Sequence, residues 1–187
     1  MSDMRYAALF VVCFMVQAAA GPPRQEPPVA KIDQLFSQLR QVSTPDDAKP
    51  IEDEIETLFM HSGSPSVDLL MTRAEAAEAG GDRDDARKLL DAVTEIAPDY
   101  AEGWHRRAAL QLATNDSGGA MVSLQRVILL NPREFRAMSE LADMLDDYGD
   151  KAGALKLYRR AIALDPKLKG VVDHLKELET EVEGQRI

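Results

Sequence analysis

The chain has 187 residues, of which 45% are hydrophobic, and its formal net charge is −10. This apolar content is too high for a disordered chain, and the length suits one compact domain or a short array of repeats. The negative charge argues against nonspecific binding to nucleic acid or to anionic membranes, because both require a basic surface. A protein or peptide partner that is basic or apolar fits the composition.

The first twenty residues have the pattern of an export signal. Residues 1–5 are polar and carry one arginine, and residues 6–16 form an apolar run of eleven residues. Such a run is short for a membrane span, which takes about 20 residues. Ala18, Ala19 and Ala20 supply the small residues that a signal peptidase accepts. We expect cleavage after Ala20, with Ala18–Ala19 as the alternative site, and hence a periplasmic or secreted protein; an uncleaved anchor or a buried strand are the competing interpretations.

Cleavage removes Cys13, the only cysteine, so the mature chain would have no disulfide, no thiolate ligand and no integral membrane span.

Residues 21–30 follow as a proline-rich linker, with four prolines between Gly21 and Pro28. Proline cannot donate a backbone hydrogen bond and keeps the chain extended. A proline-rich ligand for another domain is the alternative interpretation of this segment.

Residues 31–66 carry two apolar patterns at helical spacing, separated by Thr44-Pro45-Asp46. The first pattern comprises Ile32, Leu35, Phe36, Leu39 and Val42, and the second comprises Ile51, Ile55, Leu58 and Phe59. We interpret the two predicted helices as a degenerate pair that caps the N-terminal end of the structure that follows.

The rest of the chain repeats with a period of 34 residues, as the spacing of Pro98, Pro132 and Pro166 shows. The same shift aligns several further columns of residues. They are Ala74, Ala108 and Ala142; Ala86, Ala120 and Ala154; Leu70, Trp104 and Met138; Leu90, Leu124 and Tyr158; and Ile96, Leu130 and Leu164. Gly81-Asp82, Asn115-Asp116 and Gly149-Asp150 lie in the middle of the units.

These columns predict a helix, a tight turn and a second helix in each unit. Glycine or asparagine adopts the left-handed conformation that ends a helix, and aspartate caps the next one. Alanine allows two helices to cross closely, and proline ends the second helix. In the second unit, Gly118 and Gly119 should weaken the start of the following helix by roughly 1 kcal/mol each.

A gapless 34-residue unit of this kind resembles the tetratricopeptide repeat (TPR). The resemblance covers residues 67–100, 101–134 and 135–168, although Ala77 and Gln111 stand where the family usually has an aromatic residue. Residues 169–183 have the apolar stripe of a helix that caps the last repeat. The resemblance implies an all-α, right-handed solenoid of antiparallel helix pairs with capping helices at both ends. Residues 62–65, 97–104 and 183–185 also make the chain similar to small exported TPR proteins of alphaproteobacteria.

The sequence offers no catalytic site, cofactor site or metal site that we would propose. It contains no His-Glu-x-x-His, no phosphate-binding glycine loop and no Gly-x-Ser-x-Gly. The three histidines are scattered, and the acidic cluster of Asp143, Asp146 and Asp147 is typical of a solvated helix face. We therefore expect a binding protein and not an enzyme.

In TPR proteins the first helix of each unit lines the concave surface, which implies a set of candidate partner-binding residues. They are Asp68, Met71, Glu75, Glu78, Glu102, His105, Ala109, Leu112, Arg136, Ser139, Asp143 and Asp146. Six of them are acidic, so the groove should favour a basic or apolar ligand, although charged helix faces are also common on inert surfaces. Trp104 and Tyr158 share packing columns, which favours a core role for both.

The family's carboxylate clamp, which binds C-terminal peptide tails, fits poorly. The matching positions hold Met71, Glu75, Arg106, Arg136 and Glu140, and only two of these five are basic.

The main hypothesis is a periplasmic scaffold or adaptor that binds a peptide or protein segment in its concave groove. The alternative is a structural subunit of an envelope assembly that docks through its convex face or its proline-rich linker.

Overall fold

The computed structural model describes residues 28–184, and every regular element in this part of the chain is an α-helix. The helices are α1 (Pro28–Leu39), α2 (Pro45–Phe59), α3 (Pro65–Ala79), α4 (Arg83–Ile96), α5 (Ala101–Ala113), α6 (Ser117–Leu130), α7 (Phe135–Asp147), α8 (Lys151–Leu164) and α9 (Val171–Gly184). The predicted all-α fold class is confirmed.

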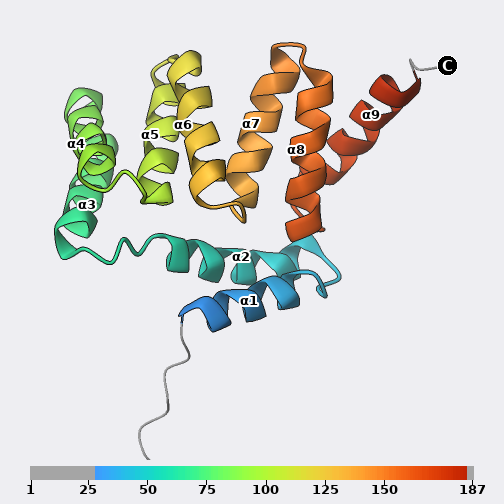
Figure 1. Ribbon diagram of the computed structural model, residues 1–187, viewed down its shortest axis with the longest axis horizontal. Helices are drawn as coiled ribbons and strands as arrows, with labels where there is room; N and C mark the ends of the chain where they lie inside the picture. The colour runs from blue at the N-terminus through green and yellow to red at the C-terminus, as the bar shows by residue number, and fades with distance from the viewer. Residues whose placement is uncertain (1–27, 185–187) are drawn as a thin grey trace, which may run out of the picture.

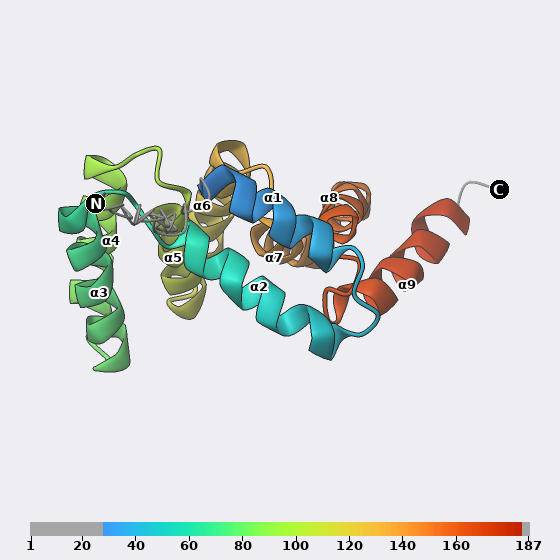
Figure 2. The ribbon, with the colours of Figure 1, turned by 90° about the horizontal axis from the view of Figure 1, so that it is seen from below.

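Three helix pairs, α3–α4, α5–α6 and α7–α8, stand side by side and form a short array (Figure 1). The first helices of the pairs, α3, α5 and α7, lie on one side of the array, and α4, α6 and α8 lie on the other (Figure 2). We call the first set the inner helices and the second set the outer helices. The three pairs coincide with the three 34-residue units.

The turn inside each pair follows from the residues at its centre. Gly81, Asn115 and Gly149 have φ values of 79°, 61° and 85°, in the left-handed region that glycine and asparagine tolerate. The aspartate that follows each of them accepts a hydrogen bond from the backbone N–H of the third residue of the next helix. This cap satisfies one of the donors that a helix start leaves unpaired.

Small residues set the distance between the helices, as the columns predict. All six column alanines, Ala74, Ala86, Ala108, Ala120, Ala142 and Ala154, are at most 2% exposed. Leu90, Leu124 and Tyr158 fill the spaces between them and are also buried. Ile96 differs from its column partners, because it is 64% exposed on the last turn of α4.

Helices α1 and α2 do not add a further repeat in front of α3. They form a hairpin that runs across the array, along the edge where the inner helices α5 and α7 begin (Figures 1 and 2). The two helices were expected and form, but their placement differs from the expected end cap. We call this hairpin, residues 28–59, the N-terminal brace.

Aromatic and aliphatic residues of the brace explain this placement. Leu35, Phe36 and Leu39 of α1 and Ile55 of α2 are at most 1% exposed and share one hydrophobic cluster with residues of α7, α8 and α9. The ring of Phe36 meets Phe135 edge-on, with 6.2 Å between the centroids. Arg133 covers the Phe36 ring at 4.0 Å and donates to Asp33 Oδ1 at 2.5 Å. Burial against the last repeat therefore determines where the brace lies.

The structure moves one predicted boundary, the one between the proline-rich linker and the first helix. Helix α1 begins at Pro28, so residues 28–30 belong to a helix and not to the predicted linker; a helix tolerates proline in its first turn, where no backbone donor is needed. Helix α9 packs on α8, as expected of a C-terminal cap. The predicted signal peptide and the rest of the linker lie outside the described residues. None of the described helices is long and apolar enough to cross a membrane.

Candidate ligand-binding groove

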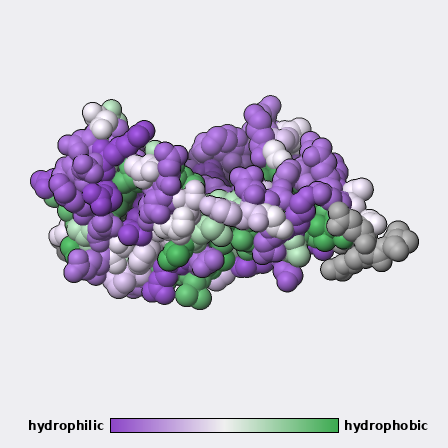
Figure 3. Space-filling model, turned by 90° about the horizontal axis from the view of Figure 1, so that it is seen from above, coloured by the Kyte–Doolittle hydropathy of each residue, from purple (hydrophilic) through white to green (hydrophobic). Residues whose placement is uncertain are grey.

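Three hollows follow one another along the inner side of the array. The first hollow, of about 310 Å³, lies between the end of α2, α3 and α5. The middle hollow, of about 230 Å³, lies between α2, α5 and α7, and the third, of about 400 Å³, lies between α7, α8 and the start of α9. The space-filling view shows the surface hollowed between two hydrophilic lobes (Figure 3).

The structure brings almost all predicted groove residues into these hollows. Asp68, Met71, Glu75 and Glu78 line the first hollow. Glu102, His105, Ala109 and Arg136 line the middle hollow, and Ser139, Asp143 and Asp146 line the third. Leu112 lines none of the three, and it is 37% exposed on the last turn of α5.

The middle hollow is a network of ion pairs that neutralise one another. His105 lies between two carboxylates, with Nε2 at 3.1 Å from Glu140 and Nδ1 at 3.5 Å from Glu102. Burial opposes the charge of the imidazole, but the bonds to both carboxylates raise its pKa to about 10. Glu102 also accepts from Arg106 Nε at 2.8 Å. Glu102 is only 5% exposed, so it serves this network and is not the ligand-facing residue that we expected.

The brace supplies acidic partners to the two arginines of the groove. Arg136 of α7 bonds to Glu56 of α2 and lies 3.5 Å from Glu52. Arg106 of α5 lies 3.8 Å from the same Glu56. These contacts were not predicted, because the sequence does not show that α2 crosses the inner helices. The one available signal was the concentration of acidic residues in α2.

Two further carboxyl groups are buried beneath the brace. Burial raises the pKa of Glu134 to about 7. Asp165 is fully buried, and its Oδ1 accepts from the backbone N–H of Lys167 at 2.9 Å. Burial, together with the nearby carboxylate of Glu52, raises the pKa of Asp165 to about 6. Asp165 Oδ2 has no hydrogen-bond partner among the described residues.

Two of the three acidic residues of the third hollow, Asp143 and Asp146, are also bound within the protein. The hydroxyl of Tyr158 donates to Asp143, and Asp146 lies 3.0 Å from Nε2 of His174. The rings of Tyr158 and His174 meet edge-on at 5.4 Å. Within residues 28–184 no group of three or more His, Cys, Asp or Glu side chains is arranged to hold a metal ion.

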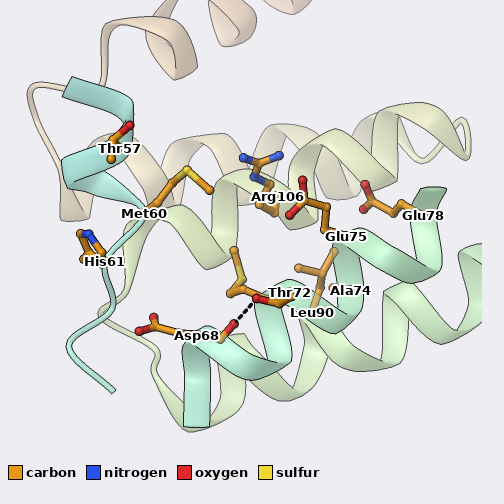
Figure 4. Close-up of a pocket in the computed structure, with 11 residues that line it drawn as sticks. Thr57, Met60, His61, Asp68, Thr72, Ala74, Glu75, Glu78, Leu90 and Arg106 are labelled. Atoms are coloured by element: carbon orange, nitrogen blue, oxygen red, sulfur yellow. Dashed lines mark hydrogen bonds between the residues drawn. The ribbon is translucent and has the colours of Figure 1, made fainter. Parts of the chain in front are cut away.

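The first hollow is different, because its floor is apolar and, among the residues that the structure describes, Arg106 is the one cation beside its acidic rim (Figure 4). Met60, Met71, Ala74 and Leu90 line it, together with the carboxylates of Glu75 and Glu78. Neither the Glu75 nor the Glu78 carboxylate forms a hydrogen bond or ion pair with a residue between 28 and 184, although the charge of Arg106 acts on both at longer range. Burial and the neighbouring Glu75 raise the pKa of Glu78, while the charge of Arg106 acts against this shift.

Hydrogen bonds fix the opposite wall of the first hollow. The hydroxyl of Ser62 donates to Asp68 Oδ1 at 2.6 Å, and the Ser62 backbone N–H donates to the same oxygen at 3.2 Å. Tyr100 donates its hydroxyl to the carbonyl of Met60 at 2.6 Å. The segment between α2 and α3 is thus tied to both α3 and the start of α5, which makes the hollow a preformed feature.

Sequence comparison decides the family. A TPR repeat-containing protein of Rhizobium etli is 33% identical over 168 residues, which cover 90% of this chain and 80% of that protein. The chain belongs to the tetratricopeptide repeat family. The family model of the tetratricopeptide repeat matches residues 67–110, which comprise the first TPR unit and the start of the second.

Solved TPR structures share the fold at low sequence identity. The TPR domain of Sgt2 from Aspergillus fumigatus has a TM-score of 0.56 and 22% identity, covering 66% of this chain and 83% of that one. The first TPR domain of Spaghetti (RPAP3), bound to an HSP90 peptide SRMEEVD, has a TM-score of 0.56 and 16% identity, covering 63% and 93%. The Yersinia enterocolitica chaperone SycD in complex with a YopD peptide has a TM-score of 0.56 and 18% identity, covering 66% and 97%.

Proposed function

We propose that this TPR protein is a scaffold or adaptor that binds a basic, extended segment of another protein along the inner helices. The observation that carries the proposal is the state of the groove charges. Arg106 and Arg136 are already paired with Glu56 of the brace, whereas the carboxylates of Glu75 and Glu78 form no hydrogen bond or ion pair with a described residue and meet only the longer-range charge of Arg106. The groove therefore offers negative potential to a ligand and little positive potential.

The fold is compatible with such a ligand. The two related structures that hold a peptide, those of RPAP3 and SycD, have the same helix-pair architecture. An acidic carboxylate tail is a poor candidate here, because a ligand of that charge would compete with Glu56 for both arginines. We accordingly assign the groove to basic segments with some apolar residues.

Substitution of Ala109 tests whether the groove binds the segment. Ala109 is exposed and lines the middle hollow, so Ala109→Trp would obstruct the groove without disturbing the core. Peptides selected by the wild-type protein from a random twelve-residue phage library should bind this variant at least tenfold more weakly, measured by fluorescence anisotropy. Ala163→Trp, on the exposed surface of the outer helix α8, is the matched control and should bind normally. Equal binding to both variants would contradict the assignment.

We further propose that the protein acts in the periplasm or outside the cell after removal of residues 1–20. The support is the sequence pattern of the N-terminal segment. Mass spectrometry of the protein purified from its native compartment should find Gly21 as the first residue. A chain that retains Met1, or that occurs only in the cytoplasmic fraction, would contradict this proposal.

An outer docking surface is the second candidate, and exposed apolar residues favour it. Val122 and Leu129 are 61% and 67% exposed and lie seven residues apart, on one face of the outer helix α6. Val122→Asp together with Leu129→Asp should abolish docking of an assembly partner through this face. The same change should leave the peptides of the groove bound.

A further inference from the structure

The first hollow has the dimensions and lining of a pocket for one long side chain. Its volume is about 310 Å³, which is too small for a folded element and sufficient for a side chain with its flanking backbone. Leu90 and Ala74 are buried at its base, and Met71 and Met60 line its apolar part. Methionine adapts to unbranched hydrocarbon chains because its own side chain is flexible and polarisable.

The charges at its rim select the end group of that side chain. Figure 4 shows Glu75 and Glu78 on successive turns of α3, both directed toward the hollow. The two carboxylates repel each other, the charge of Arg106 offsets this only in part, and a positively charged group bonded between them would relieve the rest. Arg106 approaches from α5, but its Nε already bonds to Glu102.

We propose that this hollow receives a lysine or arginine side chain of the bound segment. The methylene groups of that side chain would pack on Met60, Met71, Ala74 and Leu90, and its cationic end would bond to Glu75 and Glu78. This inference rests on the proposed function and narrows it, because it places one obligatory basic residue of the ligand against α3. The third hollow is less suited to this part, since Tyr158 and His174 already bind two of its three acids, Asp143 and Asp146.

The rigid wall of the hollow adds selectivity. Ser62, Asp68 and Tyr100 fix the segment between α2 and α3 before any ligand binds. A preformed pocket avoids the entropy cost of ordering a loop, so more of the interaction energy appears as affinity. The pocket should therefore distinguish side chains that differ only in stem length or charge.

A substitution series in the ligand tests both halves of the pocket. The probes are peptides selected from a random phage library by the wild-type chain, each resynthesised with single basic residues changed. Lysine→norleucine keeps the apolar stem and removes the charge, and lysine→2,4-diaminobutyrate keeps the charge and shortens the stem. At the one peptide position whose side chain enters the hollow, each of these two changes should weaken binding about tenfold. A loss of this size is expected when a charge-assisted hydrogen bond or the burial of the apolar stem is lost.

The matching change in the protein locates the pocket. In the variant Glu75→Gln/Glu78→Gln, the affinities of the lysine and norleucine peptides should differ by no more than about threefold. The charge of the lysine then has no carboxylate to bond to, so it no longer adds to the affinity. In the control Asp143→Asn/Asp146→Asn, the tenfold preference for lysine should persist. A lysine preference that is unchanged by Glu75→Gln/Glu78→Gln would overturn the assignment.

The remaining outcomes separate this inference from the proposed function. Peptides that are sensitive to Ala109→Trp but bind equally with lysine or norleucine would overturn the pocket and leave the groove intact. A library selection that recovers no peptide above background would contradict the groove itself, and the pocket with it.

Discussion

At the scale of single residues, the buried acids beneath the brace make stability depend on pH. Glu134 is 6% exposed, and burial raises its pKa to about 7, above the ordinary value of 4.5. A carboxyl group whose pKa is raised in the folded state favours folding at low pH, and this contribution is lost as the pH rises from 4.5 to 7. Asp165 acts in the same direction, with a pKa of about 6.

Glu134→Gln should therefore stabilise the protein in alkaline but not in acidic buffer. We expect a gain of about 3 kcal/mol in the free energy of unfolding at pH 8 and no gain near pH 4, since the pKa rises from 4.5 to about 7 and one pKa unit corresponds to about 1.4 kcal/mol. Urea denaturation at the two pH values measures the difference. The exposed Glu95→Gln is the control and should change neither value. A Glu134→Gln variant that is less stable at pH 8 would contradict the buried, protonatable state of Glu134.

His105 provides the opposite charge in the same region. Its bonds to Glu102 and Glu140 raise its pKa to about 10, so the imidazolium stabilises the fold below pH 6.5 and loses this effect as the pH rises toward 10. NMR titration of the ring should find His105 still protonated at pH 8. In Glu140→Gln the pKa should fall by about one unit, because one of the two carboxylate partners becomes neutral.

At the scale of elements, the two glycines that open α6 have different surroundings. A Cβ atom on Gly118 would meet no atom within 4 Å, whereas a Cβ on Gly119 would lie 2.2 Å from Asp116 Oδ2 and from Gln111 Nε2. Gly118→Ala should stabilise the protein by about 0.5–1 kcal/mol through helix propensity alone. Gly119→Ala should gain less, because the capping carboxylate of Asp116 must move. Thermal unfolding of the two variants gives the ranking, and a larger gain for Gly119→Ala would contradict this account.

Gly103 in α5 has a packing role that helix propensity would not suggest. A Cβ atom there would lie 2.7 Å from Val93 Cγ1 and 3.2 Å from Tyr100 Cδ1, so α5 lies too close to α4 for a larger residue. Gly103→Ala should destabilise the protein by about 1–3 kcal/mol, because overpacking outweighs the better propensity of alanine. Gly118→Ala is the control for the same chemical change on an open surface. Equal melting temperatures for the two variants would show that α4 and α5 can move apart at no cost.

The helical repeats could be predicted from the sequence, whereas the ion pairs of the groove could be predicted only in part. The alanine columns, the left-handed turn residues and the aspartate caps are local requirements, so the 34-residue period reveals them directly. The pairing of Glu102 with Arg106 is also local, since the two residues are one helical turn apart. The pairing of Arg136 with Glu52 and Glu56 depends on where a distant hairpin lies, and no periodicity encodes that position.

At the scale of the whole molecule, the N-terminal brace changes the mechanics of the array. In an ordinary solenoid each repeat contacts only its neighbours, so stability is a sum of local terms. Here the contacts of α1 and α2 join residues about a hundred positions apart, such as Asp33 and Arg133. The brace also contacts α5 and α7 through Glu56 and reaches the first hollow through Thr57. It therefore links the groove to the core of the last repeat.

Phe36→Ala tests this link. Phe36 is fully buried between the brace and Phe135, and removal of a buried aromatic ring costs about 3–5 kcal/mol. If the brace and the last repeat form one cooperative unit, the variant should exchange backbone hydrogens faster throughout α1, α2, α7 and α8, as measured by mass spectrometry. Gln38→Ala, on the exposed side of α1, should leave exchange unchanged. Faster exchange confined to α1 and α2 would mean that the hairpin is a detachable appendage, and the groove would then lose the acidic partners of Arg106 and Arg136 whenever the hairpin detached.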